Sequence, residues 1–173
     1  MVLDLTVQDE ASLSARTDFD VGIRLGEFVE ADMVAVRLSA PQRQIAAASP
    51  AYLARRGTPK VPVDLLAHDC VNWRRPGSEA PYAWEFCQDG RWFTVAVSGP
   101  LIVSDRNLAV TAALDDMGIV FWAEEILAPH LASGRLVPLL ADWSSEFPGW
   151  KIYFPRQPHM PRAVRAFIDF FSA

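Results

Sequence analysis

The stretch LIVSDRNLAVTAALDDMGIVFWAEEILAPHLASG, residues 101–134, decides the fold class. Its first apolar residues form a predicted strand that runs into Ser104 or Asp105, either of which can cap the helix that follows. The apolar run Ile119–Trp122 is then predicted as a buried strand, and a further helix ends at Gly134. A strand, a helix, a strand and a helix in succession are typical of an α/β fold with mostly parallel sheets.

Outward from this stretch, strands and helices continue to alternate through most of the chain. The clearest helix start is Ser49, a polar cap followed by Pro50, with Gly57 just past the helix end. Asp89–Gly90 is a two-residue turn favoured between the strands of a hairpin. Further strands, and an amphipathic helix at the C-terminus, are expected in the segments Leu3–Gln8, Asp20–Leu25, Asp32–Leu38, Gln44–Ala48, Asp69–Trp73, Leu136–Leu140, Lys151–Phe154 and Arg162–Phe171.

Composition and charge argue against several classes of protein. The 173 residues carry 16 basic against 21 acidic side chains, a formal charge of −5, whereas a module that grips nucleic acid by itself needs a basic face. No apolar run is long enough to span a membrane, and the N-terminus lacks the pattern of a secretory signal. Two cysteines are too few for a disulfide framework, so we expect free thiols and a reducing compartment. Together with the missing membrane span and secretory signal, this predicts a cytoplasmic protein without membrane contact.

The search for catalytic chemistry gives no candidate. The sequence has no GxSxG turn for a nucleophilic serine, no GxxxxGK[ST] phosphate loop and no GxGxxG after a strand. The run His68–Asp69–Cys70, with Cys87 further on, lacks the close ligand pairs of a zinc site, and burial of Cys70 on a strand is the better interpretation. We therefore predict a protein that is not an enzyme and holds neither a metal nor a cofactor.

Two serines and two tryptophans lie where predicted strands end. Ser49 and Ser104 stand between a strand and a helix, and a helix N-terminus at the carboxyl edge of a parallel sheet attracts anionic ligands. The plainer interpretation is that both serines are ordinary caps, each worth about 1 kcal/mol of stability. Likewise, the rings of Trp73 and Trp122 can wall a pocket or simply pack in the core.

Four long segments of the sequence together resemble one known family. They are FDVGIRLGE (19–27), DMVAVRLSAPQRQIAAASPAYLARRGTPKVPVDLLAHDCVNWR (32–74), WEFCQDGRWFTVAVSGPLIVSDRNLAVTAALDDMGIVFWAEEILAPHLASGRLVPLLADW (84–143) and FPGWKIYFPRQPHMPRAVRAFIDFF (147–171). In order and spacing they are similar to the effector-binding domain of LysR-type transcriptional regulators. The resemblance covers nearly the whole chain, so it is more specific than any single piece of it.

The resemblance implies two α/β lobes of the type II periplasmic-binding-protein kind, with a small-molecule effector in the cleft between them. Lobe one would be about residues 1–44 and 156–173, and lobe two about 45–155. An anionic effector is favoured by an arginine and two helix N-termini, and an aromatic effector stacked on a tryptophan is equally compatible. Mapped onto this sequence, the effector-binding positions of the family are Arg24, Ser49, Asn72, Trp73, Ser104, Phe121 and Trp122.

The sequence departs from the family pattern at its N-terminal side. It shows neither the winged helix-turn-helix domain nor the first strand and helix of the effector domain, so we expect DNA contacts only through a domain absent from this chain. The strand Leu3–Gln8 would then lack a neighbour, and an unpaired strand edge recruits another chain. Because family members also form dimers, a homodimer is expected.

Two other functions stay open at this point. The first is a free-standing solute-binding protein of the same fold, against which the lack of an export signal counts. The second is a small enzyme on this scaffold, since a fold never excludes an activity by itself. The missing catalytic motifs make the enzyme the weaker alternative.

Overall fold

The computed structural model describes residues 2–6, 19–25, 29, 33–74, 78–156 and 160–171. The chain divides into two compact units, of which unit 1 holds residues 1–42 and 147–173 and unit 2 holds residues 43–146. These bounds differ from the predicted lobes mainly at strand β11 (Trp150–Pro155), which pairs with strands of unit 1.

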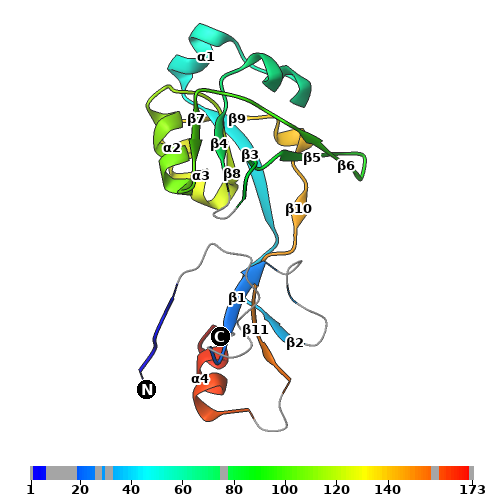
Figure 1. Ribbon diagram of the computed structural model, residues 1–173, viewed down its shortest axis with the longest axis vertical. Helices are drawn as coiled ribbons and strands as arrows, with labels where there is room; N and C mark the ends of the chain where they lie inside the picture. Colours follow the sequence, from blue (N-terminus) through cyan, green and yellow to red (C-terminus); the bar gives the residue numbers. More distant parts are fainter. Residues whose placement is uncertain are drawn as a thin grey trace. The chain divides into compact units, whose positions relative to one another are not determined.

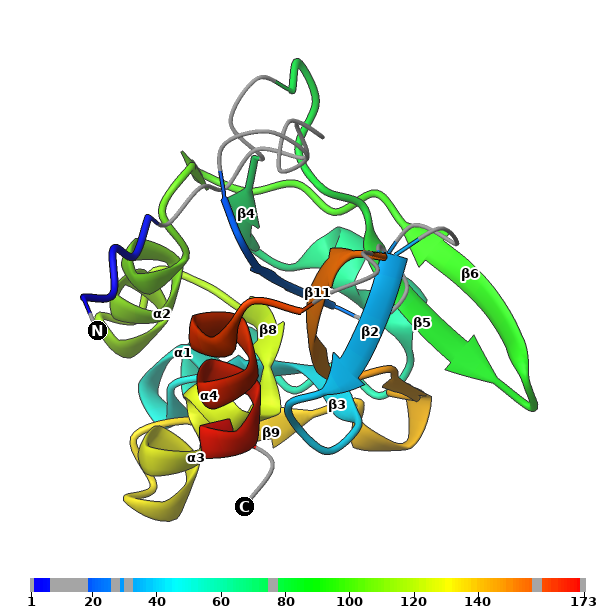
Figure 2. The same cartoon turned by 90° about the horizontal axis from the view of Figure 1, so that it is seen from below.

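Unit 1 is a three-stranded sheet with a helix packed on it (Figures 1 and 2). Strand β11 lies between β1 (Gly22–Leu25) and β2 (Met33–Arg37) and runs antiparallel to both. Helix α4 (Arg162–Phe171) buries one apolar face against the central strand. The contacting side chains are Val164, Phe167 and Ile168 of the helix and Ile152 and Phe154 of the strand.

The N-terminal strand predicted at Leu3–Gln8 is wrong for the residues that the structure describes. Val2–Thr6 has no strand pairing, and Leu3 and Leu5 are 55% and 75% exposed. Alternating apolar residues stabilise a strand only where a neighbouring strand satisfies the backbone and a core covers one face. Residues 7 and 8 lie outside the described residues.

Unit 2 is built on a sheet that has an antiparallel part and a parallel part. In the antiparallel part, β3 (Gln42–Ala48) pairs with β8 (Val120–Ala123) and β9 (Val137–Leu139). In the parallel part, β4 (Val71–Trp73) pairs with β7 (Leu101–Val103). A parallel bridge between Cys70 and Ile119 joins the two parts, with Val71 N donating to Ile119 O at 2.8 Å and Ile119 N to Asp69 O at 2.9 Å.

Short helices and a hairpin surround this sheet. They are α1 (Pro50–Arg56), the 3-10 helices η3 (Pro62–Ala67) and η4 (Ala141–Trp143), α2 (Arg106–Leu114), α3 (Glu124–Ala132), and the hairpin strands β5 (Trp84–Gln88) and β6 (Arg91–Val95); the two-residue strand β10 (Glu146–Phe147) adds to the sheet beside β3. The hairpin turns at Asp89–Gly90 with φ angles of 50° and 78°, as its sequence predicts. Within the described residues, no helix is long and apolar enough to cross a membrane.

The two faces of the unit 2 sheet are buried in different cores. Figure 1 shows α2 and α3 on one face and the β5–β6 hairpin on the other. On β3, Ile45 and Ala47 pack with the two helices, whereas Ala46 and Ala48 pack with the hairpin. Because successive strand residues point to opposite faces, a shift of one residue exchanges one core for the other.

The prediction of mostly parallel sheets is wrong, although the α/β class is right. Among the described residues, β4–β7 and the Cys70–Ile119 bridge are parallel, and the ladders β1–β11, β2–β11, β3–β8, β3–β9 and β5–β6 are antiparallel. An alternation of strands and helices gives parallel neighbours only where the helix returns the chain to the end of the sheet at which the preceding strand began. Strand β3, in contrast, brings the chain into unit 2 and runs opposite to β8.

Candidate functional site

Four of the sequence-predicted residues come together at one edge of the unit 2 sheet. In the ladder of β4 and β7, Trp73 lies opposite Val103, and counting from the Cys70–Ile119 bridge brings Trp73 level with Trp122. The carboxyl ends of these parallel strands therefore meet at the same edge, where ligands bind in open α/β sheets. Asn72, Trp73, Ser104 and Trp122 all lie along it.

The central feature of this edge is an arginine held over two tryptophans, here named the Trp–Arg cluster (Trp73, Arg106 and Trp122). The ring centroids of Trp73 and Trp122 are 6.2 Å apart at an interplanar angle of 52°. The Arg106 Cζ lies 4.1 Å from the ring centroid of Trp73 and 4.4 Å from that of Trp122. Contacts of this kind are worth about 0.5–2 kcal/mol each, more when water is excluded.

Backbone hydrogen bonding fixes the cluster in place. Trp73 Nε1 donates to the backbone oxygen of Ser104 at 3.1 Å, which sets the orientation of the indole ring. Arg106 is the first residue of α2, directly after the turn that follows β7. Sequence reasoning missed Arg106 because no motif marks it; the usable signal was a cation just past one strand end, with tryptophans at the ends of two neighbouring strands.

Of the two residues predicted to cap helix α2, Asp105 does so. Its Oδ1 accepts hydrogen bonds from the backbone N–H groups of Asn107, at 2.7 Å, and Leu108, at 3.3 Å. Ser104 is exposed, and its backbone carbonyl accepts the hydrogen bond from Trp73 Nε1 at this edge. Because the Asp105 carboxylate already occupies these amides, the N-terminus of α2 is poorly suited to bind a second anion, contrary to the expectation from Ser104.

Asn72 and Phe121 belong to the opposite face of the sheet from the tryptophans. The Phe121 ring stacks on Trp84 with centroids 5.2 Å apart and contacts Phe86 at 5.1 Å, so it is a core residue of the hairpin side. Asn72 is only 3% exposed, and its Oδ1 accepts no hydrogen bond from any residue that the structure describes. A buried acceptor without a donor is rare and costly, which makes Asn72 a functional candidate.

The prediction that Ser49 shares a sheet edge with Ser104 is wrong. Strand β3 runs antiparallel to β8, with Ala47 opposite Val120, so its carboxyl end lies at the amino end of β8. There the buried Ser49 accepts a hydrogen bond at Oγ from Tyr52 N at 3.0 Å, which is the ordinary capping role. The serine is correctly predicted as a helix cap but lies at the edge away from the Trp–Arg cluster.

Arg24 lies in unit 1, on the edge strand β1. Its guanidinium is 5.5 Å from the ring centroid of Tyr153, the residue of β11 that pairs with Gly22. The structure therefore brings four predicted residues to the unit 2 edge, places Phe121 in the hairpin-side core, and leaves Ser49 and Arg24 at other places in the chain.

Next to the Trp–Arg cluster, an ion pair anchors the start of helix α3. Arg43 on β3 donates from Nη2 to Glu124 Oε1 at 2.7 Å and from Nε to Oε2. The hydrogen bonds from Arg43 hold the pKa of the Glu124 carboxyl below its ordinary value, so the pair stays charged. Since Glu124 follows Trp122 by two residues, this contact helps to fix the end of β8.

The run His68–Asp69–Cys70 has a structural role at the far edge. The Tyr52 hydroxyl lies 3.2 Å from His68 Nδ1 and accepts a hydrogen bond from Asp69 N at 2.9 Å. Burial, and then the charge of Arg56, lower the pKa of His68, and burial raises the pKa of the Cys70 thiol to about 12. A thiol with that pKa is protonated at neutral pH and is neither a nucleophile nor a good metal ligand.

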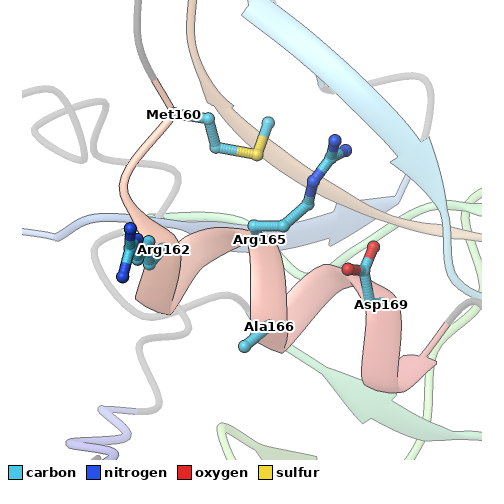
Figure 3. A pocket seen from close by; sticks show the side chains of 5 residues that line it. All are labelled: Met160, Arg162, Arg165, Ala166 and Asp169. Atoms are coloured by element: carbon cyan, nitrogen blue, oxygen red, sulfur yellow. The ribbon is translucent and has the colours of Figure 1, made fainter.

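No group of three or more metal-ligating side chains is found in the described part of the chain. A hollow of about 450 Å³ lies instead on helix α4 of unit 1, lined by Met160, Arg162, Arg165, Ala166 and Asp169 (Figure 3). In Figure 3, Met160 and Arg165 reach to one side of the helix and Ala166 points to the other. The hollow contains none of the predicted site residues, and exposed side chains of one helix form most of it, so it is not our candidate site.

Comparison with known proteins gives a consistent result. Over residues 2–173 the chain matches the family described as the LysR substrate binding domain. It is 38% identical over 168 residues to YcaN of Escherichia coli, an uncharacterized HTH-type transcriptional regulator, covering 97% of this chain and 54% of YcaN. It is 42% identical over 151 residues to a putative transcriptional regulator of Pseudomonas aeruginosa, covering 87% of this chain and 49% of that protein. The chain thus spans about half the length of both relatives.

Solved structures agree on the fold. Full-length AphB, a virulence activator of Vibrio cholerae and a member of the LTTR protein family, has a TM-score of 0.82 at 25% identity, covering 97% of this chain and 56% of AphB. The regulatory domain of CrgA from Neisseria meningitidis, a LysR-type transcriptional regulator, has a TM-score of 0.71 at 27% identity, covering 88% of this chain and 73% of that domain. The predicted periplasmic-binding-protein-like α/β fold is therefore confirmed.

Proposed function

Since the chain belongs to the LysR substrate-binding domain family, we propose that it is the effector-sensing region of a LysR-type transcriptional regulator. It takes a small molecule at the carboxyl edge of β4, β7 and β8 in unit 2. Arg24, in unit 1, stays a prediction from the family resemblance. DNA binding belongs to a region outside these residues, and a homodimer is the proposed assembly.

The Trp–Arg cluster is the observation that carries this proposal. Small-molecule sites are lined mainly by aromatic and apolar side chains with a few convergent polar groups. At this edge two indole rings and a guanidinium meet on one face of the sheet, and the buried amide of Asn72 lies at the same strand end on the other face. The exposed neighbours Ser104 and Asp105 put the cluster within reach of solvent.

Sensing is favoured over transport and over catalysis. The two relatives described above are named as transcriptional regulators, which argues for the same class here. A ligand that binds one conformation of the sensor better than another shifts the populations by its difference in affinity. In an intact regulator that shift is what a DNA-binding domain would read.

The test is a thermal-shift screen of the purified chain against a broad panel of small metabolites. We expect at least one compound to raise the melting temperature, because a ligand that binds only the folded state stabilises it. Trp122→Phe should lower the affinity for that compound. Trp92→Phe, a matched change on the exposed β6 strand, should leave the affinity unchanged. A compound that binds wild type and Trp122→Phe equally well would contradict the proposed site.

A further inference from the structure

We propose that Arg43 is a latch with two positions at the place where the chain enters and leaves unit 2. In this structure its guanidinium holds the carboxylate of Glu124, and in the second position it holds the carboxylate of Glu146 instead. The first position connects strand β3 to the start of helix α3, and the second connects β3 to strand β10. This switch goes beyond the proposed function, and its test needs no ligand.

The two ends of unit 2 in the sequence meet at this latch. Arg43 is the first residue of unit 2 and Glu146 is its last, so the chain crosses between the units directly beside both residues. In the sheet, β3 lies between β10 and β8. Strand β10 contains Glu146, and Glu124 follows β8 directly. Arg43 therefore stands on the strand between the two strands whose acidic residues it can reach.

The first position of the latch connects β3 to the candidate site. Ile45 lies opposite Trp122 in the β3–β8 ladder, and both side chains pack on the helix side of the sheet. Arg43 comes two residues before Ile45, so the alternation of a strand puts it on the same face. Its guanidinium donates from Nη2 to Glu124 Oε1 at 2.7 Å and from Nε to Oε2. A displacement of the end of β8 therefore acts on β3 through this forked contact.

Glu146 is close enough to serve as the second partner. The hydrogen bonds to Glu124 are the largest cause that raises the pKa of Arg43, and the charge of Glu146 raises it further. Charges attract each other within a screening length of roughly 8–10 Å, so the Glu146 carboxylate lies within range of the guanidinium. Glu146 is exposed and forms no ion pair with any residue in the described part of the chain.

The exposure of the pair makes an exchange of partners inexpensive. The side chains of Arg43 and Glu124 are each 36% exposed, so water competes for both. An ion pair in contact with water contributes little net stability, and a similar pair with Glu146 differs little from it in free energy. Two states of similar free energy change their populations when one of them is favoured even slightly. A small change at the end of β8 is therefore sufficient to move the latch.

Hydrogen exchange of the purified chain, followed by mass spectrometry, tests the latch. Glu124→Gln removes the first partner, so residues 121–126 at the end of β8 should exchange about 2- to 5-fold faster. Residues 144–149 around β10 should exchange slower by a similar factor, because Arg43 then pairs with Glu146. Glu125→Gln, the loss of a neighbouring exposed carboxylate on α3, is the matched control and should change both segments by less than about 2-fold.

The slower exchange of residues 144–149 is the result that a fixed ion pair does not give. It should be absent when Glu124→Gln is added to Arg43→Gln, because the latch is then already lost. Glu124→Asp keeps the charge but shortens the reach, so it should give the same two changes and keeps the test valid if Glu124→Gln does not fold. Unchanged or faster exchange of residues 144–149 in both Glu124 variants would overturn the proposal, as would slower exchange that persists without Arg43. Neither result bears on the proposed function, since no ligand takes part.

Discussion

Replacing Asn72 by leucine should stabilise the protein and lower its affinity for the ligand. The two side chains are close in size, and the site is a buried position on β4, between β7 and the end of β8. In the native chain the Asn72 Oδ1 is buried without a donor among the described residues. Leucine removes this acceptor and adds apolar surface at a place that is 3% exposed.

The magnitude follows from the cost of an unsatisfied polar group. A buried acceptor that has lost its water costs about 1–3 kcal/mol, part of which imperfect packing of the branched leucine will offset. We therefore expect the free energy of unfolding to rise by about 1–2 kcal/mol. For a chain of this size each kcal/mol moves the melting temperature by roughly 2–4 °C, so the expected increase is about 2–8 °C.

Calorimetry and urea titration of both proteins measure this difference, with Asn107→Leu on the exposed face of α2 as the control. The control should change stability by less than about 0.5 kcal/mol. Any compound found in the thermal-shift screen should bind Asn72→Leu more weakly, because the free acceptor is gone. A lower melting temperature for Asn72→Leu would refute the reasoning, since it would show that the amide stabilises the fold.

Three further predictions concern the far edge of the unit 2 sheet. Because the pKa of the Cys70 thiol is about 12, iodoacetamide at pH 8 should leave Cys70 unmodified in the native protein and label it after unfolding, as mass spectrometry will show; rapid native labelling would contradict this. Gly99→Ala should cost roughly 2–4 kcal/mol, because a Cβ at Gly99 collides with the backbone oxygen of Cys70, and an unchanged urea midpoint would count against that contact. The pKa of His68 is lowered in the folded state, because burial disfavours the charged ring. Its contribution to the free energy of unfolding is therefore fully present above the unfolded pKa of 6.5, and it is lost as the pH falls through the pKa of the folded state. His68→Gln should therefore reduce the loss of stability between pH 7 and pH 5; an identical pH profile would exclude His68 as a cause.

Much of the fold could be predicted because its signals are local. The caps, apolar runs and closing glycines of residues 101–134 give β7, α2, β8 and α3 nearly where the structure has them. The same holds for the turn Asp89–Gly90 and the cap Ser49. The family resemblance, which rests on the order of such segments over the whole chain, is confirmed by the match over residues 2–173.

Strand direction could not be predicted, and the error at Ser49 follows from it. The sequence shows that β3 ends where α1 begins, but not which way β3 runs beside β8. A strand that enters from the other unit can lie antiparallel to its neighbour without any change in its own residues. The prediction of a strand was wrong at residues 3–6 for a related reason. The alternation of apolar residues there says nothing about whether a partner strand is present.

The sequence also could not predict which face of the sheet each side chain points to. This orientation differs between residues that are adjacent in the chain. Asn72 and Trp73 both end β4, yet alternation sends Trp73 toward Trp122 and Asn72 toward the face of Phe121. Arg106 joins the tryptophans only because the parallel register of β7, β4 and β8 brings three strand ends level. A sequence motif can mark residues a few positions apart, but the members of this cluster are 16 to 49 positions apart. Their meeting depends on tertiary register, which is why the strongest candidate contact was the one that sequence reasoning did not name.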